Sequence, residues 1–291
     1  MSSGNTGHAR ALDAELLRTI HEIEIPPRPA ILDRIRREVG REQPSTRYLG
    51  VQISADVGLA AGVIRLANSA FFGCHGRSRS IHEALMVLGL DATARAVAAI
   101  SLRLAFPGTS HYERFWDASA QIAALSGWLA QTVRQPGLRA DDAYTYGLFR
   151  DCGIVILLRR VPGYMKTLER ANREAERSFT DVEGDSLPIH HGMVGCLLAQ
   201  NWWLPEELCL AIRHHHDLAA LGGPESGLPA ASRCLIAFGQ LAEHVLQRAT
   251  GASQTREWDK LGAGCLGVLG LDEADLGDLY DEGAAVVRRN R

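Results

Sequence analysis

Two short clusters of histidine contain the residues of this chain that are most suited to metal chemistry. One precedes a predicted helix and the other ends one: His190 and His191, then His214, His215 and His216. His215 shares a helical stripe with Leu208 and Ile212, so its side chain is expected to point inward. Neutral imidazole is the commonest nitrogen ligand of transition metals, so the two clusters could form one site. The helix dipole also favours histidine in a last turn without any metal, which leaves a purely structural role open.

Asp151 is another candidate because it lies among apolar residues. On a predicted helix from Asp142 to Arg160 it shares a stripe with residues expected to face the core: Tyr144, Leu148, Val155 and Leu158. A buried carboxylate without a partner is costly, so Asp151 must have one. That partner could be a metal, an arginine or the backbone donors at a helix end. From the sequence alone, a buried ion pair or a cap is favoured over a metal ligand.

Other motifs give weaker signals. The segment 262–267 matches G-x-G-x-x-G, but no strand is predicted before it, so we interpret it as a flexible joint between helices. The aromatic pairs at 71–72 and 202–203 follow predicted helix ends, where such pairs more often fill a core than stack on bases. The remaining histidines are dispersed and are expected at the surface or at caps: His8, His21, His75, His82, His111 and His244.

The elements that would position these residues are all helices. Apolar residues recur at three- and four-residue spacing, and alternating strand patterns with Asn-Gly or Asp-Gly turns are missing from the sequence. Ser80 followed by Glu83 forms a capping box, and Asp91 is expected to cap the next helix. Helices are predicted near 12–23, 30–39, 56–70, 81–88, 92–105, 114–133, 142–160, 162–177, 191–203, 205–217, 230–249 and 274–289.

Composition narrows the class of protein. The 291 residues have a formal net charge of -3 with basic residues spread along the chain, which disfavours a nucleic-acid groove or a lipid-binding surface. The six cysteines form no Cys-x-x-Cys pair, as expected for buried thiols in a reducing compartment. The uninterrupted apolar stretch Gly153 to Leu158 is far too short to span a bilayer. We therefore expect a cytoplasmic protein with neither a nucleic-acid nor a membrane partner.

Two segments of the first half resemble the HDOD domain family. They are DVGLAAGVIRLANSAFFG at 56–73 and SIHEALMVLGL at 80–90. The similarity continues through Trp116, 143–153, 191–205 and 211–217, and so covers roughly residues 15–250. This family is related to the HD and HD-GYP phosphohydrolases, whose fold places an H…HD…D set on several helices around one or two metal ions. HDOD members are thought to be output or adaptor modules in bacterial signalling, and most lack a complete set.

The resemblance implies an all-α fold in which an N-terminal helical bundle packs on a degenerate HD-like helical bundle. The expected divisions are a polar tail at 1–14, the N-terminal half of the HDOD domain at 15–110, the HD-like half at 111–250 and a C-terminal helical extension at 251–291.

Matched position by position, the chain departs from the catalytic pattern at two places. Ala118 stands where the first motif histidine is expected, and Arg150 stands where the histidine of the HD pair is expected. The resemblance leaves five vestigial ligand candidates: Asp151, His191, His215, His216 and Glu243. Hydrolysis in the related enzymes requires a metal held by a complete set of ligands. We therefore expect no bound metal, no cofactor and no catalytic residue.

The expected function is a non-catalytic regulatory module that acts through contacts with signalling proteins, whose identity and oligomeric arrangement the sequence does not specify. The candidate interaction motif is Asn68, Ser69, Phe71, Phe72, Ser80 and Gly89, although Asn68 and Ser69 could equally serve as a helix cap. Two alternatives remain. One is a metal-dependent phosphohydrolase of nucleotides or cyclic dinucleotides, and the other is a small-anion or nucleotide sensor in which Arg150 and the histidines supply the positive charge.

Overall fold

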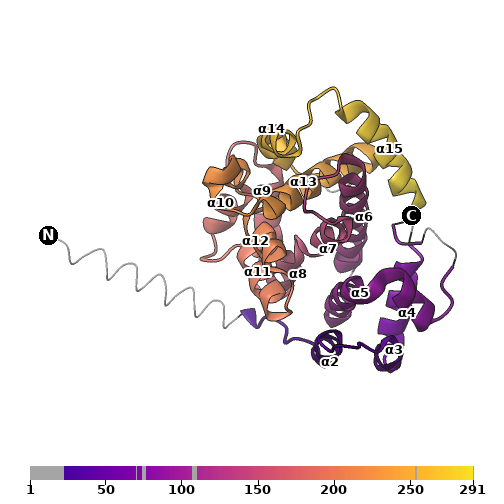
Figure 1. The fold of residues 1–291 in the computed structure, drawn as a ribbon. Helices are drawn as coiled ribbons and strands as arrows, with labels where there is room; N and C mark the ends of the chain where they lie inside the picture. The colour runs from indigo at the N-terminus through magenta and orange to yellow at the C-terminus, as the bar shows by residue number, and fades with distance from the viewer. Residues whose placement is uncertain (1–22, 70, 74–76, 107–109, 253, 291) are drawn as a thin grey trace.

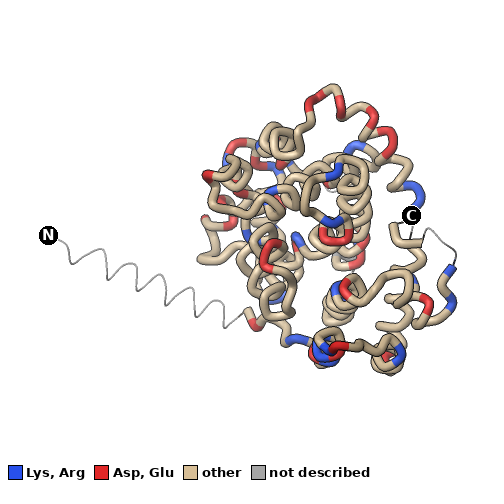
Figure 2. The backbone as a smooth tube through the Cα atoms, viewed as in Figure 1, with Lys and Arg blue, Asp and Glu red and all other residues tan. Residues whose placement is uncertain are grey.

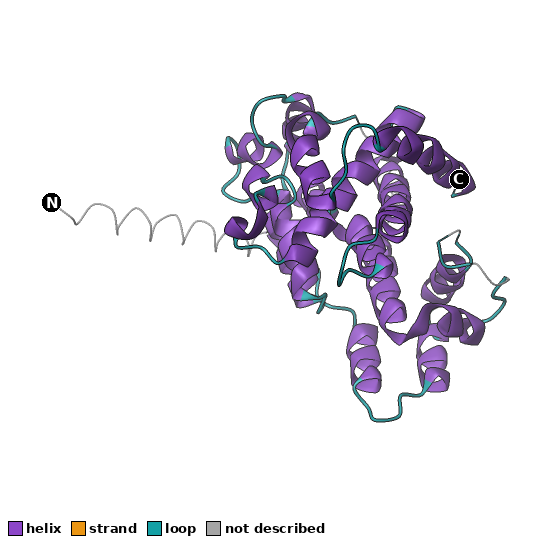
Figure 3. Cartoon of the chain, turned by 45° about the horizontal axis from the view of Figure 1, so that its top comes forward, coloured by secondary structure: helices purple, strands orange, loops and turns teal. Residues whose placement is uncertain are grey.

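The computed structural model of this chain describes residues 23–69, 71–73, 77–106, 110–252 and 254–290 (Figure 1). Helices account for 73% of the structure and no strand occurs in the described residues (Figure 3), which confirms the predicted all-α class. The elements are α2 (Ala30–Val39), α3 (Thr46–Ser54), α4 (Val57–Ala67), α5 (Ile81–Ala105), α6 (Ser110–Val133), α7 (Ala140–Phe149), α8 (Cys152–Arg160), α9 (Tyr164–Arg173), α10 (Phe179–Gly184), α11 (His191–Asn201), α12 (Glu206–His214), η1 (Leu218–Leu221), η2 (Gly223–Ser226), α13 (Ala230–Thr250), α14 (Glu257–Leu269) and α15 (Leu276–Arg289). The predicted helix 12–23 lies almost wholly outside the described residues.

Polar residues at the helix starts explain several of these boundaries. The side chains of Ser45, Asp56 and Ser178 each accept a backbone N–H from the first turn of the helix that follows. Ser80 caps α5 as predicted, accepting the Glu83 N–H at 3.2 Å. The other half of the predicted capping box differs, because the Glu83 carboxylate accepts the N–H of Arg79 at 2.6 Å.

Some predicted elements are corrected. The expected helix 142–160 is two helices, because Asp151 leaves helical geometry with φ -103° and ψ 12°. The expected helices 81–88 and 92–105 are joined within α5 across a kink at Gly89, where φ is 73°, so Asp91 caps nothing and contacts Arg139. The segment 262–267, expected as a flexible joint, lies inside α14. The sequence pattern does not predict α3, α10 or α14.

The helices form two packed regions (Figure 1). The N-terminal region, α2 to α5, lies at one end of the molecule, where α5 packs against α2, α3 and α4. In the larger region, α6 and α7 pair closely and α13 packs across both of them, as well as against α12, α14 and α15. Basic and acidic residues are interspersed along the backbone of both regions (Figure 2).

Aromatic and ionic contacts join the two regions. The Phe71 ring stacks on Tyr144 of α7 with ring centroids 4.9 Å apart, and Phe72 meets the same ring edge-on. Gly127 of α6 makes room for Phe71, since a Cβ there would overlap the ring. Arg95 of α5 forms ion pairs with Asp141 and Asp142 at the start of α7. One helix, α7, therefore receives both kinds of contact.

Among the described helices, α5 alone is long and apolar enough, by length and composition, to cross a membrane. The expectation drawn from uninterrupted apolar runs overlooked it, because charged residues such as Asp91 and Arg95 interrupt the run. Its kink at Gly89, its packing against four other helices and the ion pairs of Arg95 are features of a core helix. We interpret α5 as the central helix of the N-terminal region.

Candidate metal centre

The break between α7 and α8 places Arg150 and Asp151 in the middle of the larger region. α7 lies close against α6, because a Cβ at Gly147 would come 2.6 Å from the Ala123 Cα. α8 lies close against α11, because a Cβ at Gly153 would overlap the carbonyl of His191. Arg150 is only 2% exposed, and Asp151 makes no capping bond to α8. Both side chains are therefore available to residues on other helices.

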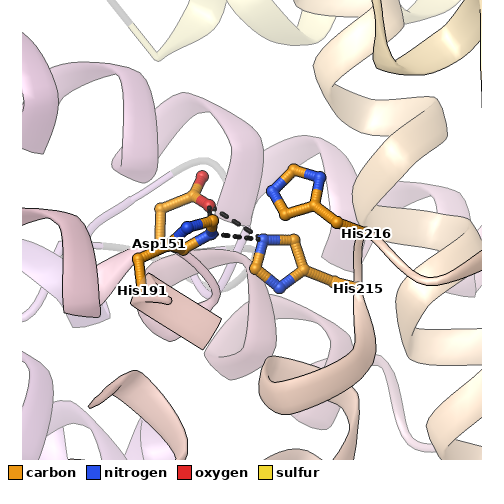
Figure 4. Close-up of side chains that lie close together, drawn as sticks. All are labelled: Asp151, His191, His215 and His216. Atoms are coloured by element: carbon orange, nitrogen blue, oxygen red, sulfur yellow. Dashed lines mark hydrogen bonds and ion pairs between the residues drawn. The ribbon is translucent and has the colours of Figure 1, made fainter. Parts of the chain in front are cut away.

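Four side chains from three separate segments of the chain converge on one point (Figure 4): Asp151, His191, His215 and His216. Each offers one ligand atom, and these atoms all lie within 4.8 Å of one another. His191 is the first residue of α11, whereas His215 and His216 follow the end of α12. The structure thus brings together four of the five vestigial candidates. The fifth, Glu243 on α13, lies apart from this cluster.

The Nδ1 atom of each imidazole is engaged by an oxygen outside the cluster. His191 Nδ1 lies 2.8 Å from Glu183 Oε2, and His215 Nδ1 lies 2.7 Å from the backbone carbonyl of Ile212. His216 Nδ1 lies 2.5 Å from Glu257 Oε2. Because these oxygens can only accept, each Nδ1 must donate its proton. Anchoring of this kind is typical of histidines that ligate metals, since it fixes both the tautomer and the ring orientation.

The second nitrogen of each ring consequently faces the cluster (Figure 4). His191 Nε2 and His215 Nε2 lie 3.2 Å apart, and His215 Nε2 lies 3.1 Å from Asp151 Oδ1. Two nitrogen lone pairs cannot face each other at that distance unless a proton or another cation lies between them. The geometry therefore requires one positive charge at this point.

The pKa shifts agree with this requirement. Burial lowers the pKa of His215 and of His216, so both are neutral near pH 7. Burial acts in the same direction on His191, but the Glu183 carboxylate outweighs it and raises the pKa of that ring. Burial would raise the pKa of Asp151, yet the Arg150 guanidinium holds it well below its usual range. The cluster thus combines a carboxylate with three oriented imidazoles.

Arg150 occupies the other side of Asp151. Its Nε donates to Asp151 Oδ2 at 3.0 Å, its Nη2 donates to Glu243 Oε2 at 2.6 Å, and its Nη1 donates to the Gly239 carbonyl at 2.9 Å. Burial lowers the pKa of Arg150, but the two carboxylates more than compensate and raise it. Asp151 and Glu243 therefore share a cation that is part of the chain.

The residues fit one metal ion and do not fit two. Three imidazole nitrogens and one carboxylate oxygen are a donor set that zinc and other transition metals accept. A second ion beside Asp151 Oδ2 would have to occupy the place of the Arg150 guanidinium. Ala118, which stands where a further histidine is expected, offers no ligand, although it lines the same cavity as Arg150, Asp151, His216 and Glu243.

Comparison with known proteins identifies the family. A model of the HDOD domain matches residues 25–218. This chain belongs to the HDOD domain family. It also resembles, at 27% identity over 234 residues, an uncharacterized protein of Treponema pallidum (strain Nichols), of which the match covers 44% and of this chain 79%. The chain thus spans less than half the length of that relative.

Solved structures share the fold of this HDOD domain. An HDOD domain protein of unknown function from Geobacter sulfurreducens is 23% identical, with a TM-score of 0.63 and coverage of 91% of this chain and 92% of that one. A Shewanella amazonensis SB2B protein, named provisionally as a phosphohydrolase, is 21% identical with a TM-score of 0.66, covering 96% and 98%. A Marinobacter aquaeolei VT8 protein, named provisionally as a signal transduction protein, is 25% identical with a TM-score of 0.66, covering 92% of this chain and 58% of that one.

The candidate interaction motif of the HDOD domain has intramolecular contacts. The Asn68 side chain accepts the Ser78 N–H at 2.7 Å and donates to the Ser78 carbonyl at 2.8 Å, which closes the loop before α5. Phe71 and Phe72 contact Tyr144, Ser80 caps α5, and Gly89 forms its kink. The Ser69 hydroxyl is buried without a hydrogen-bond partner in the described structure. A role of this motif in binding a partner stays a prediction.

Two neighbouring histidines of the clusters do not join the centre. His190 caps α11 through Nδ1, which accepts the Met193 N–H at 3.3 Å, and burial lowers its pKa to about 4. His214 lies near the surface beside Asp217. Sequence reasoning missed Glu183 and Glu257, the carboxylates that orient His191 and His216. Each lies in a helix that the sequence pattern does not predict, so no stripe indicated that it faces inward.

Proposed function

We propose that this HDOD domain is a non-catalytic regulatory module of bacterial signal transduction that acts through contacts with signalling proteins. The family and the provisionally named signalling neighbour support this class of role. The observation that favours the absence of catalysis is the Arg150 guanidinium, which is bonded to both Asp151 and Glu243. The five described cysteines are free thiols, which suits a cytoplasmic location.

The position of Arg150 explains why hydrolysis is not expected. Metal-assisted hydrolysis needs an ion with an open coordination position, where water is activated and a phosphoryl oxygen is polarised. A guanidinium has no such position and does not lower the pKa of a bound water. Its fixed charge and its three hydrogen bonds instead hold α7, α8 and α13 together.

The other side of Asp151 is suited to one structural ion. Zinc in structural sites is bound by four protein ligands, whereas catalytic zinc sites keep one position for water. Asp151, His191, His215 and His216 provide four ligands, and so would complete a tetrahedral shell. We therefore propose that the centre holds one ion, where none was expected from the sequence, and that the ion joins α8, α11 and α12.

Elemental analysis and a turnover assay test this proposal together. The full chain should contain one transition-metal ion, and His215→Ala should lose it, whereas the control His214→Ala, at the half-buried neighbouring histidine, should keep it. Phosphomonoester and phosphodiester substrates should show no turnover above that of Asp151→Ala with added zinc, manganese or iron. Two ions per chain, or metal-dependent turnover that Asp151→Ala abolishes, would contradict the proposed function.

A mononuclear phosphohydrolase is the second candidate, and one observation favours it. Asp151 and His216 line a cavity of about 1380 Å³, so a substrate could reach this side of the centre. Manganese and iron accept more ligands than zinc, and would keep open positions in the same set of four. Turnover with manganese or iron, but not with zinc, would support this candidate over the regulatory one.

A further inference from the structure

The cavity beside the metal centre is a cleft between the two regions of the molecule. Its volume is about 1380 Å³, above the usual range for a site that encloses a small organic molecule. Residues of α4 and α5 form one wall, and residues of α6, α7, α8, α9 and α13 form much of the rest. Much of the lining is apolar, including Ile100, Phe115, Leu158 and Met165. A cleft of this size and composition is suited to the apolar body of a ligand.

Four arginines line the cleft, and two of them are already committed. Arg150 is bonded to Asp151 and Glu243. Arg103 pairs with Glu113 at 2.7 Å and lies 3.9 Å from Asp117. Every carboxylate that lines the cleft is thereby matched with one of these two guanidinium groups. The earlier hypothesis that Arg150 itself would bind an anion is not favoured by this arrangement.

The other two arginines are uncommitted. Within the described residues, Arg65 of α4 and Arg114 of α6 form neither an ion pair nor a side-chain hydrogen bond, and both are exposed at the cleft. They belong to opposite regions of the molecule, one to the N-terminal region and the other to the larger bundle. The cleft therefore presents two guanidinium groups without a carboxylate partner beside an apolar wall.

We propose that this cleft binds a small organic anion, with an apolar body against the wall and its carboxylate, sulfonate or phosphate group at Arg65 and Arg114. Guanidinium groups form strong, charge-assisted hydrogen bonds with such anions. A ligand held by residues of both regions would favour the arrangement in which they lie together. The site is a chemical input for the module, and it does not depend on a metal at the neighbouring centre.

Matched fluorescent probes test the site on the full chain in the presence of a chelator. The anionic probe is 8-anilinonaphthalene-1-sulfonate, and the neutral probe is N-phenyl-1-naphthylamine, which has the same aromatic body without the sulfonate. Arg65→Gln/Arg114→Gln should weaken binding of the anionic probe about tenfold, because two charge-assisted contacts are lost. It should leave binding of the neutral probe unchanged. The control Arg47→Gln/Arg288→Gln removes two exposed arginines outside the cleft and should change neither.

Three results would overturn the proposal. One is equal binding of the anionic probe to wild type and to Arg65→Gln/Arg114→Gln, which would indicate adsorption to apolar surface alone. Another is an equal loss of affinity in the control variant, which would indicate a general charge effect. The third is binding that disappears when the chelator is added, which would place the anion on a metal instead. A failure of the proposed metal centre would leave the expected probe results unchanged, so the two proposals are separable.

Discussion

Each of the two oxygens of Asp151 needs a positive charge beside it, and the two sides of this carboxylate obtain that charge in different ways. On the Oδ2 side, Arg150 provides a cation that is part of the chain and is bonded to Glu243 as well. On the Oδ1 side, His215 and His191 present nitrogen atoms that need a cation from outside, either a proton or a metal ion. One side is therefore complete in the chain itself, and the other is completed by binding.

If the proposed function holds, this difference explains how a metal site could lose its chemistry and keep its architecture. A guanidinium compensates buried carboxylates as a metal ion does, so the helices that carried the ligands can stay in place. It cannot activate water as a metal ion does, so under the proposed function this side of Asp151 supports no hydrolysis. The imidazole side has no such guanidinium, and its three rings are oriented by Glu183, Glu257 and the Ile212 carbonyl.

The largest effect is expected when the internal cation is removed. Arg150→Met leaves the buried carboxylates of Asp151 and Glu243 without their shared partner. Breaking a buried pair in this way typically costs about 3–5 kcal/mol of unfolding free energy. Urea unfolding measures this loss of unfolding free energy. A chelator is added so that metal binding at the imidazole side of Asp151 does not contribute.

The double variant Arg150→Met/Glu243→Met is the matched control, because it removes one charge of each sign. It should recover much of the lost unfolding free energy, since apolar residues of similar volume can replace a buried ion pair at little cost. A single variant as stable as wild type would mean that water or a relaxed side chain compensates Glu243. In that case Arg150 would not be the cation that stabilises the buried carboxylates, and the contrast between the arginine side and the imidazole side of Asp151 would be wrong.

The second effect is the conversion of the arginine side into a metal site. Ala118→His/Arg150→His supplies two imidazoles beside Asp151 and Glu243, so the double variant should bind one ion more than wild type. We expect the affinity at this second position to rise about 100-fold, or ~2.7 kcal/mol. Calorimetric titration with manganese and zinc measures both the number of ions and the affinity.

The single variants show whether both histidines are needed. Arg150→His alone removes the internal cation but leaves the shell short of an imidazole at 118, and Ala118→His alone leaves the guanidinium in place. Neither should bind the additional ion. An equal number of ions in all four proteins would show that the helices have moved too far for position 118 to serve as a ligand.

The fold class follows from local patterns, and therefore could be predicted from the sequence. Three- and four-residue spacing, the cap at Ser80 and the prolines before α2 are short-range signals. The break at Asp151 could not be predicted in this way, because residues 142–160 keep a helical apolar pattern across it. The break is stabilised instead by contacts distant in sequence, above all those of Arg150 with Gly239 and Glu243.

The candidate centre was only partly predictable for the same reason. The resemblance to a known motif indicated Asp151, His191, His215 and His216 because their types and order match. It also indicated Glu243, which the structure places against Arg150 rather than with the histidines. No sequence pattern indicated Glu183 or Glu257, whose roles depend on packing between helices. Both residues act by orienting a histidine.

A smaller effect is expected from one of those orienting residues. Glu183→Gln keeps an oxygen that can accept from His191 Nδ1 but removes the negative charge that raises the pKa of His191. Losing such an orienting carboxylate typically weakens metal affinity 10- to 100-fold, and we expect the lower end, about tenfold, because the acceptor remains. Zinc titration against a competing chelator measures this, with the exposed Asp185→Asn as control. Equal affinity in both variants would mean that Glu183 does not orient the ring.

The smallest effect concerns His244 on α13, a histidine outside the candidate metal centre. Its Nε2 contacts a tyrosine hydroxyl, whereas the Nε2 atoms of the centre need a proton or a metal ion. Its ring stacks on Trp258 with centroids 4.5 Å apart, and the Tyr280 hydroxyl lies 3.0 Å from its Nε2. Burial, followed by the nearby Arg248 charge, lowers its pKa to about 4. The folded state therefore resists protonation of His244, whereas the unfolded state protonates near pH 6.5.

The sign of the pH dependence follows from linkage. The contribution of His244 is fully present above about pH 6.5 and is lost as the pH falls toward 4, because only the unfolded state gains the proton in that range. The side chain is only half-buried, so screening should limit the loss to about 1 kcal/mol. His244→Phe keeps the stack on Trp258 but cannot titrate. Unfolding free energies measured by urea between pH 4 and pH 7 should therefore fall less steeply in the variant, and parallel curves would show that His244 is not shielded from protonation.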